Sequence, residues 1–545
     1  MSDTPTTTEQ RLVQFKIDGK EFEAPAGTTI IQAAHAAGIE VPFFCYHPGL
    51  TPEGNCRMCL VEVVKGRKPV ASCVTPVEEG MEVITNSPAA KEARKGVLEL
   101  MLVNHPLDCP ICDKSGECEL QDNTYNHGPD NSRMVELKEL KPTKDLGSNI
   151  ALWGNRCIVC TRCVRFCDEV SGTGELSIVN RADHSVVDVF DEYPLENPLS
   201  MNTVDICPVG ALISKDFLYE SRVWYLNKTK SICTGCARGC NISVESVRNE
   251  IKRLMPRHND DVNGYWMCDY GRFDFGYVGD GRLYRYHLVG SSSGEEDPQV
   301  SSNPADAAGV IADRLRSTVE AHGADSIAGV GSAFMTLEEL FLFRKIFESL
   351  GSTALGALSR PDANPESFPQ FAISGDKNPN RAGVKAVLGD GALGADLDTI
   401  KSGVEKGTIR ALVVVADLPN TPLDEEWARL LGSLDVAFVL SLTAPESLSK
   451  SVSILPASAF AEKNGTMINE DGRLQRLRTA VEPPRSVRLE LELFQAVLGK
   501  LGQWERVVSA DGVFRQLGEI VPALAGKTHR DVGELGMSLN GGGNV

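Results

Sequence analysis

The run Cys157-Ile-Val-Cys160-Thr-Arg-Cys163-Val-Arg-Phe-Cys167 sets four thiols close together, and Cys207-Pro208 follows farther along the chain. Thiolates at separations of two and three residues are typical metal ligands. A zinc knot also uses close cysteines, but zinc sites rarely join such a triplet to a distant Cys-Pro. The sequence therefore predicts an iron-sulfur cluster here.

The spacing C-x2-C-x2-C-x3-C is that of bacterial ferredoxins, in which three cysteines hold one [4Fe-4S] cluster and the fourth ligates another. If Cys207 closed a second run of this kind, cysteines would stand at 197, 200 and 203. Asn197, Ser200 and Thr203 occupy those positions instead. We therefore expect Cys167 to be unused and a single [4Fe-4S] cluster to remain. Its predicted ligands are the other cysteines quoted above: Cys157, Cys160, Cys163 and Cys207.

The composition bounds the class of protein. The chain has 545 residues, which is long enough for three or four domains. Its residues are 42% hydrophobic and 24% charged, the composition of an ordinary soluble globular protein. A net charge of -19 argues against nucleic acid as a partner. The first residues lack the basic and apolar regions of a secretory signal, and no apolar run approaches a membrane span. We expect a cytoplasmic chain without direct membrane insertion.

All 16 cysteines lie between Cys45 and Cys268. A disulfide scaffold is typical of short secreted chains, whereas a large chain without a signal and with C-x2-C pairs more often binds metal. The first half of the chain is therefore predicted to bind metal, and the second half to serve another purpose.

The N-terminal segment predicts a small sheet. Apolar residues alternate on both sides of Asp18-Gly19, which is typical of a hairpin over 13–24. Thr29-x-x-Gln32 is a capping box that opens a helix, and 60–64 and 70–72 read as strands. This order suggests the ubiquitin-like (β-grasp) sheet on which plant-type ferredoxins are built.

Cys45-x10-Cys56-x2-Cys59-x13-Cys73 lies on this sheet. Plant-type [2Fe-2S] proteins carry C-x4-C-x2-C and a distant cysteine, so the pattern matches apart from a longer first loop. Gly54 allows the backbone to approach the cluster. The alternatives are four structural cysteines or a zinc ribbon.

A helix is predicted from Ser87-Pro88, an N-cap followed by proline, to a point before Pro106. Its apolar face is expected to hold four residues: Ala90, Ala93, Val97 and Met101.

Beyond the end of this helix stand His105 and Cys109-x2-Cys112-x5-Cys118. Three thiolates need a fourth ligand for a [4Fe-4S] cluster, and His105 is the nearest uncommitted one. An imidazole in place of a thiolate removes one negative charge and should make reduction easier. The alternative is that His105 only interacts with the helix dipole.

A fourth set follows, after short strands predicted over 176–179 and 186–189. Its spacing, Cys233-x2-Cys236-x3-Cys240-x27-Cys268, differs from both ferredoxin types. Four clusters need four ligands each, which 15 cysteines and His105 supply once Cys167 is set aside.

The order of these motifs resembles that of the large iron-sulfur subunits of respiratory complex I, the proton-translocating NADH:quinone oxidoreductase. The resemblance implies one [2Fe-2S] and three [4Fe-4S] clusters on the ligand sets above. It implies a role as an electron-transfer subunit of that enzyme, without turnover by this chain alone. Electrons would enter from the FMN- and NADH-binding subunit at the [2Fe-2S] site. They would then pass to the Cys157 set and the His105 set, and leave toward quinone.

The resemblance further implies that the fourth cluster, which only some bacterial members of the family retain, lies off this route. It also implies quinone-side iron-sulfur subunits as further partners. It implies a peripheral position on the cytoplasmic side of the inner (plasma) membrane.

The C-terminal half reads as a parallel α/β domain. A linker at 291–296 precedes helices that alternate with strands near 326–330, 411–415 and 437–440. The run 454–475 resembles molybdopterin oxidoreductases, as does the Cys233 to Cys268 spacing. Those enzymes usually carry lysine just after the last cluster cysteine, where this chain has Asp269-Tyr-Gly-Arg272, and no cysteine follows Cys268 to ligate molybdenum. We therefore expect the fold without the cofactor.

The segment Gly389-Asp-Gly391-Ala-Leu-Gly394 fits the dinucleotide pattern G-x-G-x-x-G after a possible strand over 384–388. The pattern also requires an acidic residue about 20 positions later, and none stands clearly before Asp417. Dinucleotide binding is therefore not favoured.

The predicted organisation is α+β iron-sulfur domains followed by an α/β domain. The boundaries are 1–86 ([2Fe-2S] β-grasp), 87–148 ([4Fe-4S] with one histidine and three cysteine ligands), 149–225 (ferredoxin-like [4Fe-4S]), 226–288 ([4Fe-4S] with four cysteine ligands), 289–530 (molybdopterin-oxidoreductase-like) and a flexible tail, 531–545. Three other functions fit parts of the pattern. One is a molybdenum-dependent formate dehydrogenase, but this chain lacks the cysteine that would ligate molybdenum. Another is an iron-only hydrogenase, which would need further cysteines. The third is a zinc scaffold, which would contain neither iron nor sulfide.

Overall fold

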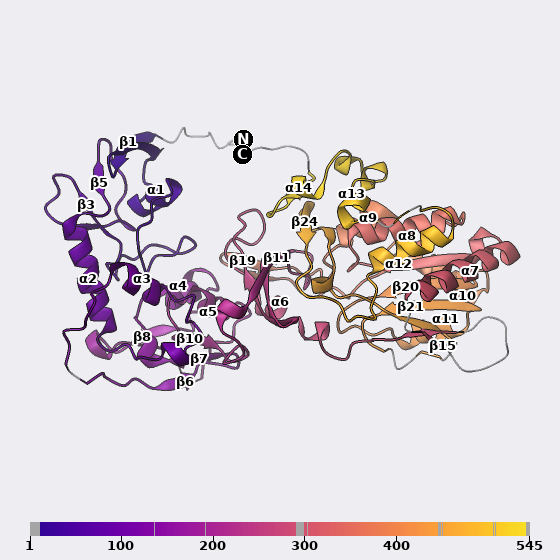
Figure 1. Ribbon diagram of the computed structural model, residues 1–545, viewed down its shortest axis with the longest axis horizontal. Coiled ribbons are helices and arrows are strands. Elements are labelled where there is room, and N and C mark those ends of the chain that lie inside the picture. Colours follow the sequence, from indigo (N-terminus) through magenta and orange to yellow (C-terminus); the bar gives the residue numbers. More distant parts are fainter. Residues whose placement is uncertain are drawn as a thin grey trace, which may run out of the picture. The chain divides into compact units, whose positions relative to one another are not determined.

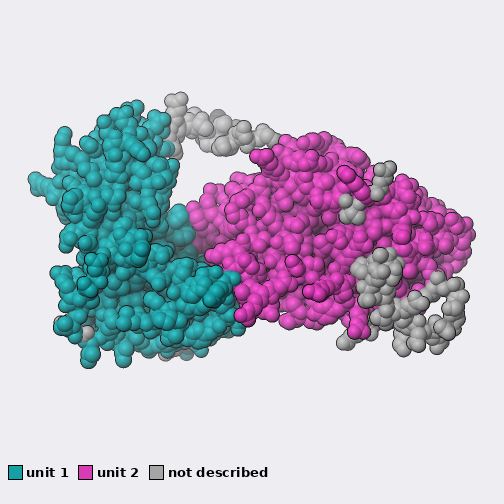
Figure 2. All heavy atoms as spheres, in the orientation of Figure 1, with its two compact units in different colours: residues 1–225, 368–371 teal, residues 226–367, 372–545 magenta. Residues whose placement is uncertain are grey.

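The computed structural model describes residues 11–135, 137–190, 192–289, 299–301, 304–444, 448–449, 451–504, 506 and 508–540. The chain forms two compact units (Figure 2). Unit 1 comprises residues 1–225 and 368–371, and unit 2 comprises residues 226–367 and 372–545. The expected linker at 291–296 lies outside the described residues. Each unit is described by itself, with the element labels of Figure 1.

Unit 1 begins with a five-stranded sheet in the order β2-β1-β5-β3-β4. β1 pairs in parallel with β5, and the other neighbours are antiparallel. The hairpin turn has positive φ at Asp18 (50°) and Gly19 (80°), the geometry that suits a two-residue turn. The predicted capping box starts α1, where the Thr29 hydroxyl oxygen accepts from the Gln32 N–H at 3.4 Å. The β-grasp prediction is confirmed. The bounds are β1 Leu12–Ile17, β2 Lys20–Pro25, α1 Ile30–Ala36, β3 Leu60–Val63, β4 Val70–Ala71 and β5 Glu82–Ile84.

The helix after this sheet, α2 (Pro88–Leu102), begins at the predicted N-cap Ser87. Its predicted apolar face is wrong in part, because the buried residues are Ala90, Arg94 and Leu98. Arg94 donates to the carbonyl of Thr85 at 2.7 Å and to that of Leu60 at 3.1 Å. A charged side chain can occupy the inner face because backbone carbonyls satisfy its donors.

The rest of unit 1 consists of short elements around long loops. A three-stranded sheet has the order β10-β7-β6, and β8 pairs antiparallel with β9, close to the strands predicted at 176–179 and 186–189. The bounds are η1 Cys109–Ile111, α3 Glu119–His127, β6 Thr143–Asp145, β7 Ile150–Trp153, η2 Gly154–Arg156, α4 Arg162–Glu169, β8 Ser177–Val179, η3 Ala182–His184, β9 Val186–Asp188, α5 Asn202–Ile206, β10 Leu212–Ser214 and η4 Val223–Tyr225.

Unit 2 contains a three-stranded antiparallel sheet, β11-β12-β13, and a seven-stranded sheet in the order β15-β14-β22-β21-β20-β16-β17. In the larger sheet, β22, β21, β20, β16 and β17 run parallel, and β14 and β15 are antiparallel at one edge. The strand bounds are β11 Asn227–Ile232, β12 Asn241–Val247, β13 Glu250–Pro256, β14 Tyr286–Leu288, β15 Gln299–Ser301, β16 Ile327–Ser332, β17 Leu355–Leu358, β20 Ala411–Ala416, β21 Val436–Ser441 and β22 Ser453–Pro456.

The other elements of unit 2 follow or separate these strands. The last residue of β18 and the first residue of β19 fall within 368–371, which belongs to unit 1. The helix bounds are α6 Asp269–Phe273, α7 Pro304–His322, α8 Leu337–Ser349, α9 Arg381–Leu388, α10 Ala395–Glu405, α11 Glu425–Gly432, α12 Glu490–Lys500, α13 Ala510–Phe514 and α14 His529–Val532. The remaining strands are β18 Glu366–Phe368, β19 Phe371–Ile373, β23 Gly465–Ile468, β24 Arg473–Leu477 and β25 Met537–Ser538. The short helical turns are η5 Gly276–Val278, η6 Ala324–Ser326, η7 Phe460–Glu462, η8 Leu517–Glu519 and η9 Pro522–Leu524.

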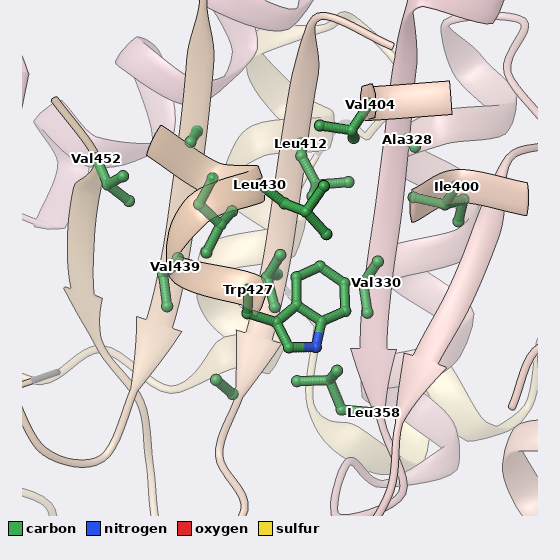
Figure 3. Close-up of a cluster of buried hydrophobic side chains, with 14 of the residues drawn as sticks. Ala328, Val330, Leu358, Ile400, Val404, Leu412, Trp427, Leu430, Val439 and Val452 are labelled. Atoms are coloured by element: carbon green, nitrogen blue, oxygen red, sulfur yellow. The ribbon is translucent and has the colours of Figure 1, made fainter. Parts of the chain in front are cut away.

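Helices cover both faces of the parallel sheet. Successive residues of a strand point to opposite faces. On one face, Val330 of β16 belongs to a buried cluster with Ile400 of α10 and Trp427 of α11 (Figure 3). On the other face, a Cβ added to Gly329 would lie 2.4 Å from the ring of Phe347, on α8. The predicted parallel α/β arrangement is confirmed.

The segment before Gly389 is helical, so the strand predicted at 384–388 is wrong. The buried residues of α9 are Gly383, Val384 and Val387, which fall on one face at helical spacing. A dinucleotide-binding turn joins a strand to a helix, whereas this glycine pattern follows a helix. The structure therefore gives the pattern no support as a nucleotide site.

Of the expected flexible tail, residues 531–540 are described. They include the end of α14 and β25, whose Met537 pairs with Leu474 of β24. Within the described part of the chain, no helix combines the length and the apolar character needed to cross a bilayer.

Unit 2 contains several buried ion pairs, two groups of which are centred on Arg282 and Lys463. Arg282 and Glu462 form a two-point pair at 2.8 and 2.9 Å, with both side chains at most 2% exposed. The Lys463 ammonium lies 3.2 Å from carboxylate oxygens of both Glu339 and Asp417. Burial raises the pKa of Glu339 to about 7, against the opposing charge of Lys463.

Candidate iron-sulfur sites

The first cysteine set lies at one end of the β-grasp sheet. Cys45 and Cys56 stand in the loop between α1 and β3, Cys59 directly precedes β3, and Cys73 follows β4. The Cys45 N–H donates to the Cys56 sulfur at 3.4 Å. Hydrogen bonds with the Cys56 and Cys73 thiols lower the pKa of Cys45, and a hydrogen bond with the Cys73 thiol lowers the pKa of Cys59. The four predicted ligands are therefore brought together.

The second set gathers beyond the end of α2. Cys109 is the first residue of the 3-10 turn η1, Cys112 directly follows this turn, and Cys118 is the N-cap of α3. The Nδ1 atom of His105 is buried and, among the described residues, has no hydrogen-bond partner. Burial, with the positive charges of Arg156 and Lys138, lowers the pKa of His105 to about 4. The ring is therefore neutral at pH 7, which is the form that ligates metals.

The backbone after Cys207 lies against this second set. A Cβ added to Gly210 would stand 2.2 Å from the sulfur of Cys112, closer than a side chain allows. Burial raises the pKa of Cys112, and it raises the pKa of Cys118 to about 11. Buried thiols of this kind become thiolates when a positive centre binds them, as in a metal site.

The third set surrounds the start of α4. The loop before this helix has positive φ at Val159 (50°) and Thr161 (64°), so the chain turns sharply between its cysteines. The Val159 N–H donates to the sulfur of Cys157 at 3.4 Å. Burial raises the pKa of Cys163 well above its usual value, and the nearby sulfurs raise it further: Cys160, Cys157, Cys207 and Cys167. The four predicted ligands thus converge.

The positions that a second ferredoxin site would need are occupied by buried polar residues. Cys167 is fully buried, and Asn197, Ser200 and Thr203 are buried as well. The Asn197 amide donates to Glu175, and the Thr203 hydroxyl donates to the Ser200 carbonyl at 2.7 Å. Hydrogen-bonded polar side chains therefore stand where the ligands of that site would be.

The fourth set lies in unit 2. Its four cysteines, between β11 and the start of α6, line a cavity of about 590 Å³: Cys233, Cys236, Cys240 and Cys268. The Gly235 N–H donates to the sulfur of Cys233 at 3.4 Å, and the Gly271 N–H donates to that of Cys268 at 3.5 Å. A Cβ added to Gly271 would lie 2.7 Å from the sulfur of Cys233. The backbone of α6 therefore lies against the sulfurs of two predicted ligands, Cys233 and Cys268.

The variant Gly271→Ala is expected to lose the metal of this set alone, about four iron atoms if it is a [4Fe-4S] cluster. The added methyl would displace the Cys233 sulfur, because 2.7 Å is below any ordinary carbon–sulfur contact. Iron per chain measures the loss. In the control Gly279→Ala, the added carbon meets no atom closer than 4.0 Å, so iron should be unchanged. Full iron in Gly271→Ala would contradict this account.

The spacing of the sulfurs bears on the zinc alternative. A tetrahedral zinc ion with Zn–S bonds of about 2.3 Å holds its sulfurs roughly 3.8 Å apart. Across the described residues, which include every cysteine, one group alone has three ligand atoms all within 4.8 Å of one another: Glu139, Asp183 and His184. Among the described residues, no cysteine set therefore has three sulfurs that all lie within 4.8 Å of one another.

Several contacts in these sites could not be read from cysteine spacing. Gly210 and Gly271 approach ligand sulfurs because the fold brings distant segments together. The sequence does contain one indication of such contacts. Three arginines stand directly before or among the cysteines of the run 157–167: Arg156, Arg162 and Arg165. Each of them contacts another cysteine-bearing segment.

Five family models match successive parts of the chain. They are described as a 2Fe-2S iron-sulfur cluster binding domain (residues 10–88), an NADH-ubiquinone oxidoreductase-G iron-sulfur binding region (94–133), an NADH-quinone oxidoreductase subunit 3 ferredoxin-like domain (147–213), an NADH-ubiquinone oxidoreductase NDSU1/NuoG-like 4Fe-4S domain (226–276) and molybdopterin oxidoreductase (395–500). The chain thus carries 2Fe-2S and 4Fe-4S binding domains and a molybdopterin oxidoreductase region, as expected.

Three relatives show the extent of the similarity. The G subunit of NADH-quinone oxidoreductase from Rickettsia felis is 40% identical over 341 residues, which are 63% of this chain and 50% of that protein. The NADH-ubiquinone oxidoreductase 75 kDa subunit of Reclinomonas americana is 42% identical over 344 residues, 63% of this chain and 49% of that protein. The mitochondrial NADH dehydrogenase [ubiquinone] iron-sulfur protein 1 of Solanum tuberosum is 39% identical over 341 residues, 63% and 45% of the two chains.

The matched part thus spans about half the length of these curated relatives. Among solved structures, an NAD+-reducing [NiFe]-hydrogenase in the H2-reduced state is similar at a TM-score of 0.35 and 32% identity, covering 39% of this chain and 91% of that one.

Proposed function

Because the chain is related to the G subunit of NADH-quinone oxidoreductase, the 75 kDa subunit of complex I, we propose that it is an electron-transfer subunit of a proton-translocating NADH:quinone oxidoreductase. The observation that supports this most directly is the second ligand set. There the Nδ1 atom of His105 is buried without a partner among the described residues, the pKa of the ring is lowered to about 4, and Cys109, Cys112 and Cys118 follow it closely in the chain. The chain itself is not expected to turn over a substrate.

The proposed ligands are the four sets predicted from the sequence. They are Cys45, Cys56, Cys59 and Cys73 for one [2Fe-2S] cluster, and three sets for [4Fe-4S] clusters: His105, Cys109, Cys112 and Cys118; Cys157, Cys160, Cys163 and Cys207; Cys233, Cys236, Cys240 and Cys268. The match of residues 10–88 to a 2Fe-2S iron-sulfur cluster binding domain supports the smaller cluster in the first set. Iron-sulfur clusters, when bound, accept and release single electrons.

The chain's own groups bind and tune these clusters. Backbone N–H groups of Val159, Gly235 and Gly271 point at ligand sulfurs and stabilise negative charge on them. Positive side chains do the same by charge, and Arg156 lowers the pKa of Cys112 against the effect of burial. Each such contact stabilises the reduced, more negative form of a cluster and raises its potential.

The proposed partners are the FMN- and NADH-binding subunit on one side and the quinone-side iron-sulfur subunits on the other. The chain is proposed to lie on the cytoplasmic side of the inner (plasma) membrane, without inserting into it. Nucleic acid is not proposed as a partner, since the net charge of -19 opposes it.

For the second half we propose a molybdopterin-oxidoreductase-like domain that binds no molybdopterin. Support comes from the residues available, because no cysteine follows Cys268 and no lysine directly follows it. The predicted domain boundaries are part of this proposal. One matched model ends at residue 88, near the boundary predicted after 86, and another begins at 226, where a domain is predicted to begin.

The test is metal analysis of the full chain purified without oxygen. We expect about 14 iron atoms with matching acid-labile sulfide, and EPR signals of one [2Fe-2S] and three [4Fe-4S] centres after reduction. The control Cys167→Ser should keep all of the iron. Zinc without sulfide would indicate a structural scaffold instead. Molybdenum together with formate oxidation would indicate a formate dehydrogenase.

A further inference from the structure

The side chain of Arg165, on α4, binds the loop of the first cysteine set. Its guanidinium donates to the carbonyl oxygen of Cys45 itself and, at 2.6 Å, to that of Thr51. Its Nε lies 3.4 Å from a carboxylate oxygen of Glu53. The side chain is only 11% exposed, so these contacts are largely shielded from water.

Further hydrogen bonds join the same loop to residues at both ends of α4. The Thr51 N–H donates to the carboxylate of Glu169, at the end of α4, at 2.8 Å. The Thr161 hydroxyl, at the start of α4, donates to Glu53, and the Asn55 amide reaches the same hydroxyl oxygen at 3.4 Å. Both ends of the helix therefore bind one loop, 46–55.

This loop is the part of the first site that departs from plant-type spacing. Plant-type ferredoxins have four residues between their first two cysteines, and this chain has ten. Three of these ten residues contact α4: Thr51, Glu53 and Asn55. The longer spacing is thus explained as an attachment to the segment that carries the third set.

We propose that Arg165 is a positioning residue that fixes loop 46–55 on α4 and raises the potential of the cluster held by Cys45. The inference rests on the proposed function and goes beyond it, because it assigns a role to a residue that ligates nothing. Arg165 lies two positions after Cys163 on the same helix, so one side chain joins a ligand of the first set to the backbone of the third.

The direction of the effect on potential follows from charge. A reduced cluster carries one more negative charge than an oxidised one. A guanidinium hydrogen-bonded to the carbonyl of a ligand, in a site with little water, stabilises that charge. Removing the guanidinium should therefore lower the potential of the first cluster.

The other two arginines both contact the second set, and one of them, Arg156, serves as the internal comparison. Arg162 forms a two-point pair with Glu119, directly after Cys118, at 2.7 and 2.8 Å. Arg156 donates to Asp108, directly before Cys109, at 2.9 Å. Arg162 also lies over the ring of Phe43, 5.6 Å from its centroid and close to the first set, so the comparison uses Arg156. A change at Arg156 should act on the His105 set and leave the [2Fe-2S] potential unchanged.

The experiment uses the full chain with its clusters, as Arg165→Gln, Arg165→Lys and the exposed control Arg133→Gln, whose side chain is 83% exposed. We expect Arg165→Gln to keep its iron and its [2Fe-2S] EPR signal. The midpoint potential of that signal should fall, and amide hydrogen exchange in 46–55 should speed up by about tenfold, the factor for a lost local stability of about 1.4 kcal/mol.

Arg165→Lys should recover most of the potential, because the charge remains. It should recover little of the exchange protection, because a single ammonium nitrogen does not reproduce the two separate NH2 groups with which the guanidinium reaches the two carbonyls. The wild-type potential and wild-type exchange in Arg165→Gln would overturn the inference. Absence of a [2Fe-2S] signal in the wild-type chain would instead overturn the proposed function, so the two failures are distinguishable.

Discussion

His105→Ala is expected to lose about four iron atoms per chain and one [4Fe-4S] EPR signal, while the other three sets stay loaded. Three cysteines remain at this site, but the fourth coordination position would face a methyl group. The buried Nδ1 of His105 has no partner among the described residues, so its removal breaks no protein hydrogen bond there. Loss of iron would therefore report loss of a ligand and not of a structural contact.

Two further variants sharpen this test. His105→Cys should keep all of the iron and lower the potential of the one cluster, because a thiolate adds a negative charge where a neutral ring stood. His127→Ala changes a half-buried histidine in the last turn of α3 and should leave iron unchanged. If His105→Ala retains the full iron content, the ligand assignment is wrong.

Glu462→Gln is expected to lower the free energy of unfolding of unit 2 by about 3–5 kcal/mol. The change leaves the guanidinium of Arg282, which is 1% exposed, without its opposite charge in a site shielded from water. The carboxylate of Glu462 also accepts from the Ala459 N–H at 2.7 Å, so a backbone donor loses part of its acceptor strength. The midpoint of the unit 2 transition in a calorimetric or urea scan measures the effect.

The matched control is Glu405→Gln, whose partner Arg429 and own side chain are both more than half exposed. Water screens that pair, so a change below about 1 kcal/mol is expected. The double variant Arg282→Met with Glu462→Leu should regain much of the stability, since it removes both buried charges. Equal destabilisation by Glu462→Gln and Glu405→Gln would show that burial of the pair is not the cause.

The sequence predicted those parts of the fold that depend on local signals. The hairpin at Asp18-Gly19 and the capping box at Thr29 are set by a few neighbouring residues, and both are present. The run of buried β-branched and leucine residues in β20 likewise indicated a parallel strand. Such features require no knowledge of distant contacts.

The errors arose where distant contacts decide the outcome. Arg94 is buried in α2 because carbonyls of a separate strand and loop accept its hydrogen bonds, which periodicity cannot reveal. The segment 384–388 is short and apolar, so pattern alone could not distinguish a helix from a strand.

For the sites, cysteine spacing grouped the predicted ligands, because metal ligation imposes short, regular separations. It could not show what surrounds them. The approach of Gly210 to Cys112 and the reach of Arg165 to Cys45 join segments far apart in the chain. These are properties of the folded surface and leave no regular trace in the sequence.

Cys167 gives the chain a built-in reporter of its own motions. Cys167 is assigned to no cluster, and it is fully buried near the C-terminal end of α4. A maleimide can reach it only when the structure around it opens, so its labelling rate in the loaded chain would measure how often the surroundings of α4 open.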